Sequence, residues 1–261
     1  MRTNGVSGFR RGAVALVVLA ASVGLTACSA GAASDPAPKP TASDAADGGI
    51  AGLDADDAVA RVLEATRRTS TVHVVGTYVA PGVEGEGGAE SGDAVTQPGN
   101  EMTIDLSGAR ERFTAVLTVD GAVSEWRRID GEVFVHGDLA AEALLGLRGV
   151  STGFVGLRAD DVRIVDWLTL LDVEAVLQSV LDPGLDDVVV TVGAAGADTP
   201  STIQLAVTAA GSLIGTVVVD GAGAALPLSL TVSDAAGSGD FTFSDWGVTA
   251  PVERPTVLAE P

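Results

Sequence analysis

Two Asp-Gly pairs, at positions 120–121 and 130–131, separate runs in which apolar and polar residues alternate. An Asp-Gly pair between alternating runs is a strong signal for a two-residue hairpin turn, because both residues tolerate a positive φ. Alternation places Phe113 and Leu117 on one face of a strand and Thr114 on the other. The pattern therefore predicts an antiparallel meander, with strands at residues 102–107, 112–119, 123–129 and 132–136.

Further helices and strands are predicted on both sides of this meander. Asp54 is placed to cap a helix that runs through residue 68, and a β-branched run then predicts a strand over 71–80. Helical periodicity returns at 139–147 and 161–181, with a break near 169–172. Five more strands are expected at 188–192, 202–209, 213–220, 228–233 and 241–246. This order predicts an α+β fold in which helices cover the concave face of a curved antiparallel sheet.

Residues 1–27 predict an export signal. Arg2, Arg10 and Arg11 precede an apolar run over 12–25, which is too short to span a bilayer as a stable helix. The run ends in Leu-Thr-Ala-Cys, which resembles the bacterial lipobox and implies cleavage before Cys28 and lipidation of its thiol. An ordinary signal peptide followed by a chance cysteine is the alternative. Two or more acyl chains would hold the exported protein on the outer face of the cytoplasmic membrane, within the cell envelope.

Charge and cysteine content exclude several classes of partner. The chain has 15 basic and 35 acidic residues and a net charge of −20, which becomes −23 once the three arginines of the leader are removed. Nucleic acid is not an expected partner, because phosphate backbones are bound by clustered Lys and Arg. The single cysteine excludes a disulfide within the chain and a Cys-cluster metal site. Because 46% of residues are hydrophobic, we expect a folded core with an acidic surface.

Two low-complexity segments interrupt the pattern, one before the predicted domain and one within it. Residues 28–53 are rich in Ala, Pro and Asp and predict a flexible tether, and residues 81–100 predict an acidic, Gly-rich loop. The regular Asp spacing of a calcium loop is absent from this loop. A single domain is expected over 54–255, with a helical insertion at 139–183 and a tail at 256–261.

Ser151 lies in a Gly-x-Ser-x-Gly pattern that is typical of a hydrolase nucleophile elbow. That arrangement needs a strand before the serine and a histidine after it, whereas His73 and His136 both precede Ser151 and no strand leads into it. The two histidines are far apart in sequence, so a metal pair is not expected. We therefore expect no enzyme activity, no catalytic residue, no metal and no cofactor.

Several segments resemble the LppX and LprG lipoproteins of actinobacterial cell envelopes. Besides Cys28, the resemblance rests on STVHV at 70–74, IDGEVFV at 129–135, VVVD at 217–220 and FSDWG at 243–247, and it covers roughly residues 54–255. Members of this family have a half-open antiparallel barrel, similar to the LolA and LolB carriers, with a lipid cavity between sheet and helices. The resemblance implies a membrane-anchored lipoprotein that binds or transports an acylated lipid or glycolipid, with envelope transport proteins as further partners.

A lipid tail needs a dry apolar cleft of several hundred cubic ångströms. The apolar strand and helix faces that would line it are Val72, Val74, Met102, Ile104, Leu106, Phe113, Ala115, Leu117, Val119, Trp167, Leu168, Leu171, Val176, Leu177, Ile203 and Leu205. The alternative is that these residues pack against the helices and leave no cavity. A second class of function also stays open, in which the chain is an interaction module that presents its acidic loop to a partner protein.

Overall fold

A computed structural model describes residues 49–81, 100–182, 184, 187–194, 201–235, 237–249 and 251–257. The chain divides into two compact units, residues 1–40 and 41–261, and all described residues belong to the second. The expected leader, Cys28, nearly all of the tether and residues 82–99 of the acidic segment lie outside the described residues, so those expectations stay predictions.

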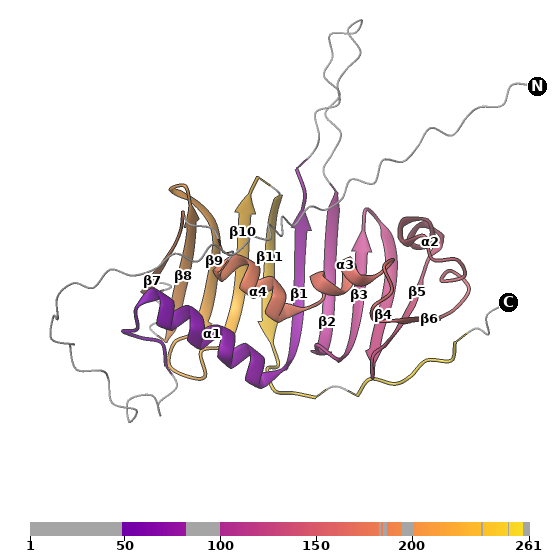
Figure 1. The fold of residues 1–261 in the computed structure, drawn as a ribbon, viewed down its shortest axis with the longest axis horizontal. Helices are drawn as coiled ribbons and strands as arrows, with labels where there is room; N and C mark the ends of the chain where they lie inside the picture. Colours follow the sequence, from indigo (N-terminus) through magenta and orange to yellow (C-terminus); the bar gives the residue numbers. More distant parts are fainter. Residues whose placement is uncertain are drawn as a thin grey trace, which may run out of the picture. The chain divides into compact units, whose positions relative to one another are not determined.

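The second unit contains one antiparallel sheet of eleven strands (Figure 1). Its spatial order is β6-β5-β4-β3-β2-β1-β11-β10-β9-β8-β7, so β6 and β7 are free edges and the sheet is not closed. This confirms the predicted α+β class and the half-open antiparallel sheet. The strands are β1 (Thr71–Val79), β2 (Glu101–Ala109), β3 (Arg112–Val119), β4 (Ala122–Ile129), β5 (Glu132–Gly137), β6 (Val155–Arg158), β7 (Val188–Ala194), β8 (Thr202–Ala209), β9 (Ser212–Asp220), β10 (Pro227–Asp234) and β11 (Gly237–Ser244).

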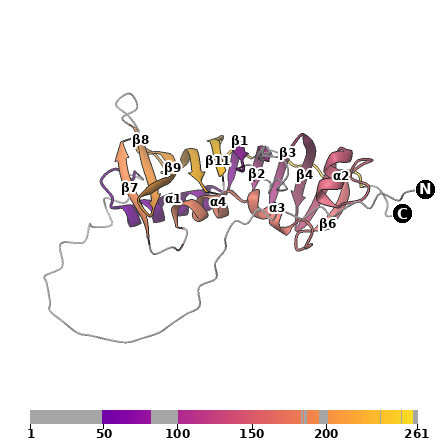
Figure 2. The same cartoon turned by 90° about the horizontal axis from the view of Figure 1, so that it is seen from above.

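Two meanders meet in the middle of the sheet. Strands β1 to β6 each pair with the next strand in sequence, as do β7 to β11, and the two series are joined by the β1–β11 pair. In that pair Val74 lies opposite Phe243, while its partner on β2 is Leu106. The connection from the β6 edge to the β7 edge contains two helices, which cross one face of the sheet (Figures 1 and 2).

Four helices accompany the sheet: α1 (Ala55–Thr69), α2 (Leu139–Leu145), α3 (Val165–Leu170) and α4 (Val173–Leu181). Figure 2 shows α1, α3 and α4 along the same face. As predicted, Asp54 caps α1, its carboxylate accepting a hydrogen bond from the Asp57 N–H at 2.9 Å. Asp138 and Asp172 cap α2 and α4 in the same way. The expected break falls at Leu171 and Asp172, between α3 and α4.

One large hydrophobic cluster lies between the sheet and the helices. Its largest fully buried side chain is Trp126 of β4, which a hydrogen bond holds in place. The indole Nε1 donates to the Ser124 hydroxyl at 2.9 Å, and that hydroxyl donates to the Leu117 carbonyl at 3.2 Å. Each fully buried Leu, Val or Phe stabilises such a core by about 1.5–3 kcal/mol.

A second, smaller cluster lies apart from the main core. It consists of Ile129, Phe134 and Val252, with Phe154 packed against them. Residues 251–257, which we call the C-terminal strap, contribute Val252 and form a parallel bridge from Val257 to Phe154. Arginine side chains hold the strap: Arg112 donates to the Val252 carbonyl at 3.1 Å, Arg127 donates to the Glu253 carbonyl at 3.2 Å, and Arg254 lies 5.0 Å from the Phe134 ring centre.

Several predicted boundaries are wrong. Strand β6 lies in the region that was expected to be helical, because four residues that include Gly156 are too few to show an alternating pattern. Strand β11 begins at Gly237, four residues before the expected start, and ends before Trp246. Its Gly-Ser-Gly-Asp beginning predicts a turn locally, yet pairing with β1 and β10 makes it a strand. Helix α2 ends at Leu145, where Gly146 has a φ of 65°.

Candidate functional site

The sixteen residues proposed as a cavity lining all belong to one apolar cluster. Eleven are buried, and Met102, Val119, Trp167, Val176 and Ile203 are partly buried and pack against the others. Trp167 of α3 lies 6.4 Å from Trp126 of β4, measured between ring centres, so α3 is in direct contact with the sheet. The sequence therefore identified the inner faces of the sheet and helices. Whether they line a lipid cavity stays a prediction.

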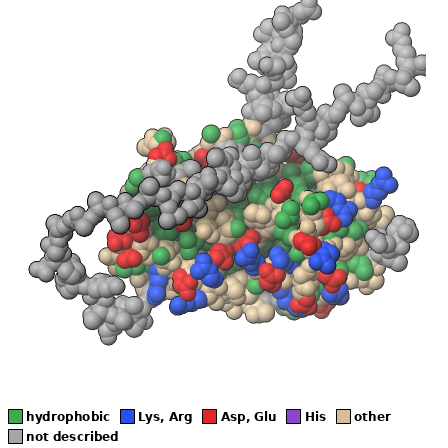
Figure 3. Space-filling view, viewed as in Figure 1, with side chains coloured by type: hydrophobic (Ala, Val, Ile, Leu, Met, Phe, Trp, Pro, Cys, Tyr) green, Lys and Arg blue, Asp and Glu red, His purple; other side chains and the backbone are tan. Residues whose placement is uncertain are grey.

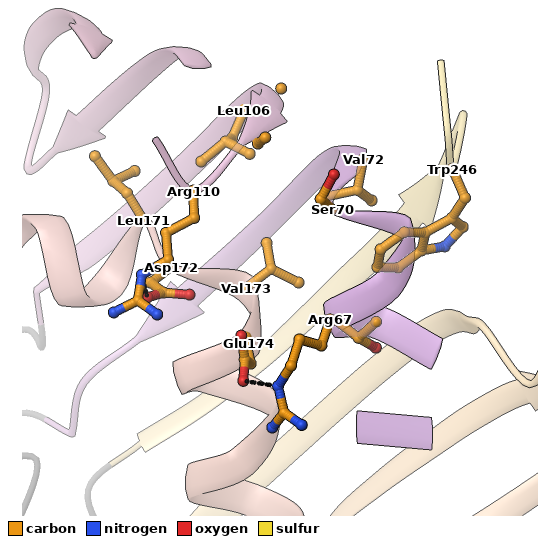
Figure 4. A pocket seen from close by; sticks show the side chains of 13 residues that line it. Arg67, Ser70, Val72, Leu106, Arg110, Leu171, Asp172, Val173, Glu174 and Trp246 are labelled. Carbon is orange, nitrogen blue, oxygen red and sulfur yellow. Dashed lines mark hydrogen bonds and ion pairs between the residues drawn. The ribbon is translucent and has the colours of Figure 1, made fainter. Parts of the chain in front are cut away.

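A pocket opens where the end of α1, the start of β1 and the junction of α3 with α4 meet (Figure 4). Its volume is about 150 Å³. Three residues of the proposed lining, Val72, Leu106 and Leu171, belong to its wall, so the pocket connects the surface to the apolar interior. The other residues that line it are Thr66, Arg67, Ser70, Gly108, Ala109, Arg110, Asp172, Val173, Glu174 and Trp246.

Local backbone geometry creates this pocket. Ser70 has a φ of 50° and donates its backbone N–H to the Thr66 carbonyl, so the chain turns sharply from α1 into β1. Trp246 follows β11 and donates its Nε1–H to the Pro227 carbonyl at 2.7 Å, which fixes the indole at the pocket wall. Its ring stacks on Phe243, with ring centres 6.1 Å apart.

Two ion pairs cross the mouth of the pocket. Arg67 of α1 contacts Glu174 of α4 at 3.0 Å, and Arg110 of the β2–β3 turn contacts Asp172 at 3.0 Å. The hydrogen bond and the charge of Glu174 raise the pKa of Arg67, so the guanidinium stays charged. Figure 3 shows acidic and basic side chains interspersed along the lower part of this face. Surface pairs of this kind contribute only about 0–1 kcal/mol each.

Asp172 has two roles at this mouth. Its carboxylate accepts the Ala175 N–H at 3.3 Å as the N-cap of α4 and also pairs with Arg110. Its side chain is only 12% exposed, in contrast to 63% for Arg110. One carboxylate therefore caps α4 and links its first turn to the β2–β3 turn. Sequence reasoning missed this link because Arg110 and Asp172 are far apart in the chain.

A second pocket, of about 290 Å³, lies at the free edge formed by β7. It lies between the first residues of α1, the end of α4 and the edge strand. Its lining combines apolar side chains with two carboxylates: Ala55, Asp56, Leu181, Asp182, Gly184, Val188, Val189 and Val190.

The sequence pattern around Ser151 has a structural explanation. The Ser151 hydroxyl and backbone N–H both donate to the Glu142 carboxylate of α2, and these bonds lower the pKa of Glu142. The preceding element is α2 rather than a strand, so the geometry of a nucleophile elbow is absent at this serine. His136 packs against Phe154, with ring centres 5.3 Å apart.

The structure brings His73 into an arrangement that the sequence did not indicate. Its Nε2 lies 3.0 Å from Asp105 Oδ1, and its Nδ1 lies 3.4 Å from the Ser244 hydroxyl. These residues belong to three adjacent strands and are solvent-accessible, and neither pocket described above includes them. A serine nucleophile also needs oxyanion donors and a substrate pocket, so this trio carries no catalytic assignment.

Within the described residues, no helix is long and apolar enough to cross a membrane. The same part of the chain contains no group of three or more His, Cys, Asp or Glu side chains placed to hold a metal ion.

Comparisons with known proteins return structures only. No family model matches the chain, and no curated protein matches it. Among solved structures, LprF from Mycobacterium bovis is 16% identical with a TM-score of 0.44, and the match covers 78% of this chain and 97% of that one. The lipoprotein LppX of Mycobacterium tuberculosis, which shares its name with the family that the sequence resembles, is 16% identical with a TM-score of 0.43. That match covers 76% of this chain and 98% of LppX.

Proposed function

We propose that this chain is an exported lipoprotein, anchored through Cys28, that binds an acylated lipid between the sheet and helices α3 and α4. The observation that carries the proposal is the pocket beside α4, because its wall includes Val72, Leu106 and Leu171 of the apolar interior. An acyl chain entering there meets aliphatic side chains, while the charged residues at the mouth stay in contact with water and with a polar headgroup.

The pocket volume requires that binding widens the site. Sites for small organic ligands usually enclose about 300–1,000 Å³, whereas this pocket encloses about 150 Å³. Lipid binding therefore involves movement of α3 and α4 away from the sheet, with acyl chains taking the place of side-chain contacts. In this mechanism the residues of the proposed lining are core in the empty protein and ligand contacts in the loaded one.

Helices α3 and α4 are suited to such a movement. They have six and nine residues, and their fully or nearly fully buried side chains are Leu168, Leu177 and Leu181. At the pocket mouth, α4 is attached through the Arg67–Glu174 and Arg110–Asp172 pairs, which are weak at a solvated surface. The end of α4 is more firmly packed, since Val180 lies in the space above Gly215, where a Cβ would come within 2.8 Å of it.

Native mass spectrometry of the purified full chain tests lipid binding. We expect a bound mass that organic solvent releases as an acylated lipid, or uptake of phosphatidylglycerol from vesicles made of that lipid. Val173→Trp fills the pocket from the first turn of α4 and should lower the loaded fraction at least fivefold. Val116→Trp, at a position that is 45% exposed on β3, is the matched control. No bound lipid and no uptake by the unsubstituted chain would sink the proposal.

Labelling with a palmitate analogue tests the anchor separately. Cys28 is the only cysteine, so Cys28→Ala removes every thiol and should abolish acyl labelling, whereas Ser29→Ala should leave it intact. Labelling that survives Cys28→Ala overturns the lipobox assignment without affecting the cavity.

A further inference from the structure

The two edge strands of the sheet, β6 and β7, differ in length and in the contacts at their outer sides. Strand β6 has four residues, and the residue before it, Phe154, forms a bridge with Val257 of the C-terminal strap. Strand β7 has seven residues, and its only strand partner within the described part of the chain is β8. Within that part of the chain, no strand pairs with the outer row of its backbone N–H and C=O groups.

The sequence of β7 lacks the usual protection of an edge strand. Val-Val-Val-Thr-Val-Gly-Ala contains no charged residue and no proline, although Lys, Pro and inward charges are the common means of blocking edge-to-edge association. Val188, Val190 and Val192 pack against the core, while Val189 is 55% exposed and Thr191 is exposed. Such a strand is a template for β-pairing.

The pocket of about 290 Å³ lies on this same edge. The first turn of α1 and the last turn of α4 contribute Ala55 and Leu181 to its wall, opposite Val188 and Val190. A strand added beside β7 would direct every second side chain toward the helices, next to these residues. The helices therefore leave space over the edge for the inward side chains of a twelfth strand.

We propose that a second copy of this chain supplies that strand, pairing antiparallel with β7 about a two-fold axis at Thr191. In this register Thr191 lies opposite the partner's Thr191, and Val190 lies opposite the partner's Val192. Directly opposed Thr–Thr and apolar pairs contribute about 0.2–1 kcal/mol each. The same patch meets itself, as a two-fold interface requires, and the two sheets become continuous.

The charge distribution favours this edge over the rest of the acidic surface. A net charge of −20 opposes self-association wherever carboxylates meet. Asp187 precedes β7 by one residue and is four positions from the axis, so the two copies of Asp187 would be separated by about 26 Å at about 3.3 Å per residue. That separation exceeds the Debye length of about 8 Å at physiological salt. The pocket carboxylates, Asp56 and Asp182, would face the partner's uncharged Val192 and Ala194.

Cysteine cross-linking of the full chain tests the register. Thr191→Cys places two thiols on the axis, where opposed Cα atoms are about 4.5–5.5 Å apart, within the range of about 4.4–6.8 Å that a disulfide spans. Mild oxidation should convert most of this variant to a covalent dimer. The unsubstituted chain controls for Cys28, and Thr242→Cys, an exposed threonine on β11, controls for collision. Cross-linking of Thr191→Cys no greater than that of Thr242→Cys overturns the proposal.

Sedimentation of the full chain in detergent tests the energetics. Thr191→Lys opposes two like charges on the axis and should raise the dimer dissociation constant at least tenfold, whereas Thr242→Lys should leave it unchanged. Both threonines are exposed, so neither substitution disturbs the core. A monomeric unsubstituted chain, or a dimer that persists in Thr191→Lys, refutes pairing through β7.

Discussion

Strands β1–β6 and strands β7–β11 are two antiparallel meanders of similar size that share the β1–β11 pair, yet their packing differs. The first meander contains the three largest fully buried side chains, Trp126, Phe113 and Phe134, and its far face is covered in part by the C-terminal strap. The second relies on aliphatic residues such as Leu205 and Leu230, and no second cluster is found on its far face within the described residues.

Charge divides in the same way. From residue 164 to residue 253 the chain has no Lys or Arg, so β7–β11 present acidic but no basic side chains. In the first meander, Arg112 and Arg128 pair with carboxylates of hairpin turns, and Arg127 pairs with Glu125 of its own strand. Arg112 and Arg127 also donate hydrogen bonds to the strap. Within the described residues, the first meander is therefore packed on both faces and its arginines bind the strap, whereas the second is packed on one face.

The largest effect that we expect concerns Trp126. Trp126→Ala leaves a cavity and removes the partner of the Ser124 hydroxyl, so we expect a loss of about 3–5 kcal/mol in the free energy of unfolding. Leu205→Ala, in the second meander, should cost about 2–4 kcal/mol by cavity formation alone. Denaturant unfolding measures both. We expect the first meander, with its buried aromatic side chains, to contribute more to stability than the second. A larger loss for Leu205→Ala than for Trp126→Ala would contradict this expectation.

The C-terminal strap should make the next largest contribution to stability. Val252, the second residue of the strap, is buried, and Val252→Ala removes two methyl groups, at about 0.8 kcal/mol each, and leaves a small void. We expect a loss of about 2 kcal/mol by the same measurement. Val189→Ala, at an exposed position on β7, should change stability by less than about 0.5 kcal/mol. Equal losses for Val252→Ala and Val189→Ala would mean that the strap adds no stability to the first meander.

Amide hydrogen exchange compares the halves directly. We expect amides of β7 and β8 to exchange at least about tenfold faster than those of β3 and β4. The reason is that strands at a solvent-exposed edge have few buried contacts to stabilise them. The comparison should be made at protein concentrations above and below those at which the chain associates, since edge pairing would protect β7. Equal protection of β7, β8, β3 and β4 at low concentration would contradict the expected difference in stability between the two meanders.

The smallest expected effect is an acid sensitivity near β6. Two hydrogen bonds to Arg163 lower the pKa of Asp161 from 3.8 to about 2, and a bond to the Ser151 hydroxyl lowers that of Glu142. A carboxyl with a lowered folded-state pKa contributes stability above its unfolded pKa and loses that contribution as the pH falls through the folded value. Melting temperature should therefore decline between about pH 4 and pH 2, less steeply in Arg163→Gln. A variant profile parallel to the unsubstituted one would contradict this assignment.

Most of the fold followed from local patterns in the sequence. The Asp-Gly turns fixed the β3–β4 and β4–β5 hairpins, since Asp120 and Asp130 both adopt a positive φ. Asp54 and the switch at Ser70 located α1 and β1, because a cap and a change of period are visible within a few residues. Alternation also identified the buried faces, which is why the proposed lining lies in one cluster.

Features that depend on distant partners did not follow from the sequence. Gly237 to Asp240 are a strand only because β1 and β10 lie on either side of them. The Arg67–Glu174 pair joins residues 107 positions apart, and no local pattern indicates which carboxylate an exposed arginine will meet. The same holds for the pocket, whose wall contains residues of α1, β1, β2 and α4 together with Trp246.

The β1–β11 pair has a consequence for how the chain folds. Each meander is made of neighbouring hairpins and can form early, but His73 pairs with Ser244, 171 residues later. Contacts of such separation are slow to form, because a long loop must be closed before they contribute any stability. During synthesis from the amino terminus, one side of β1 stays unpaired until β11, the last strand, has been made. Until then β1, which is central in the complete sheet, is an exposed edge strand of the partly formed sheet.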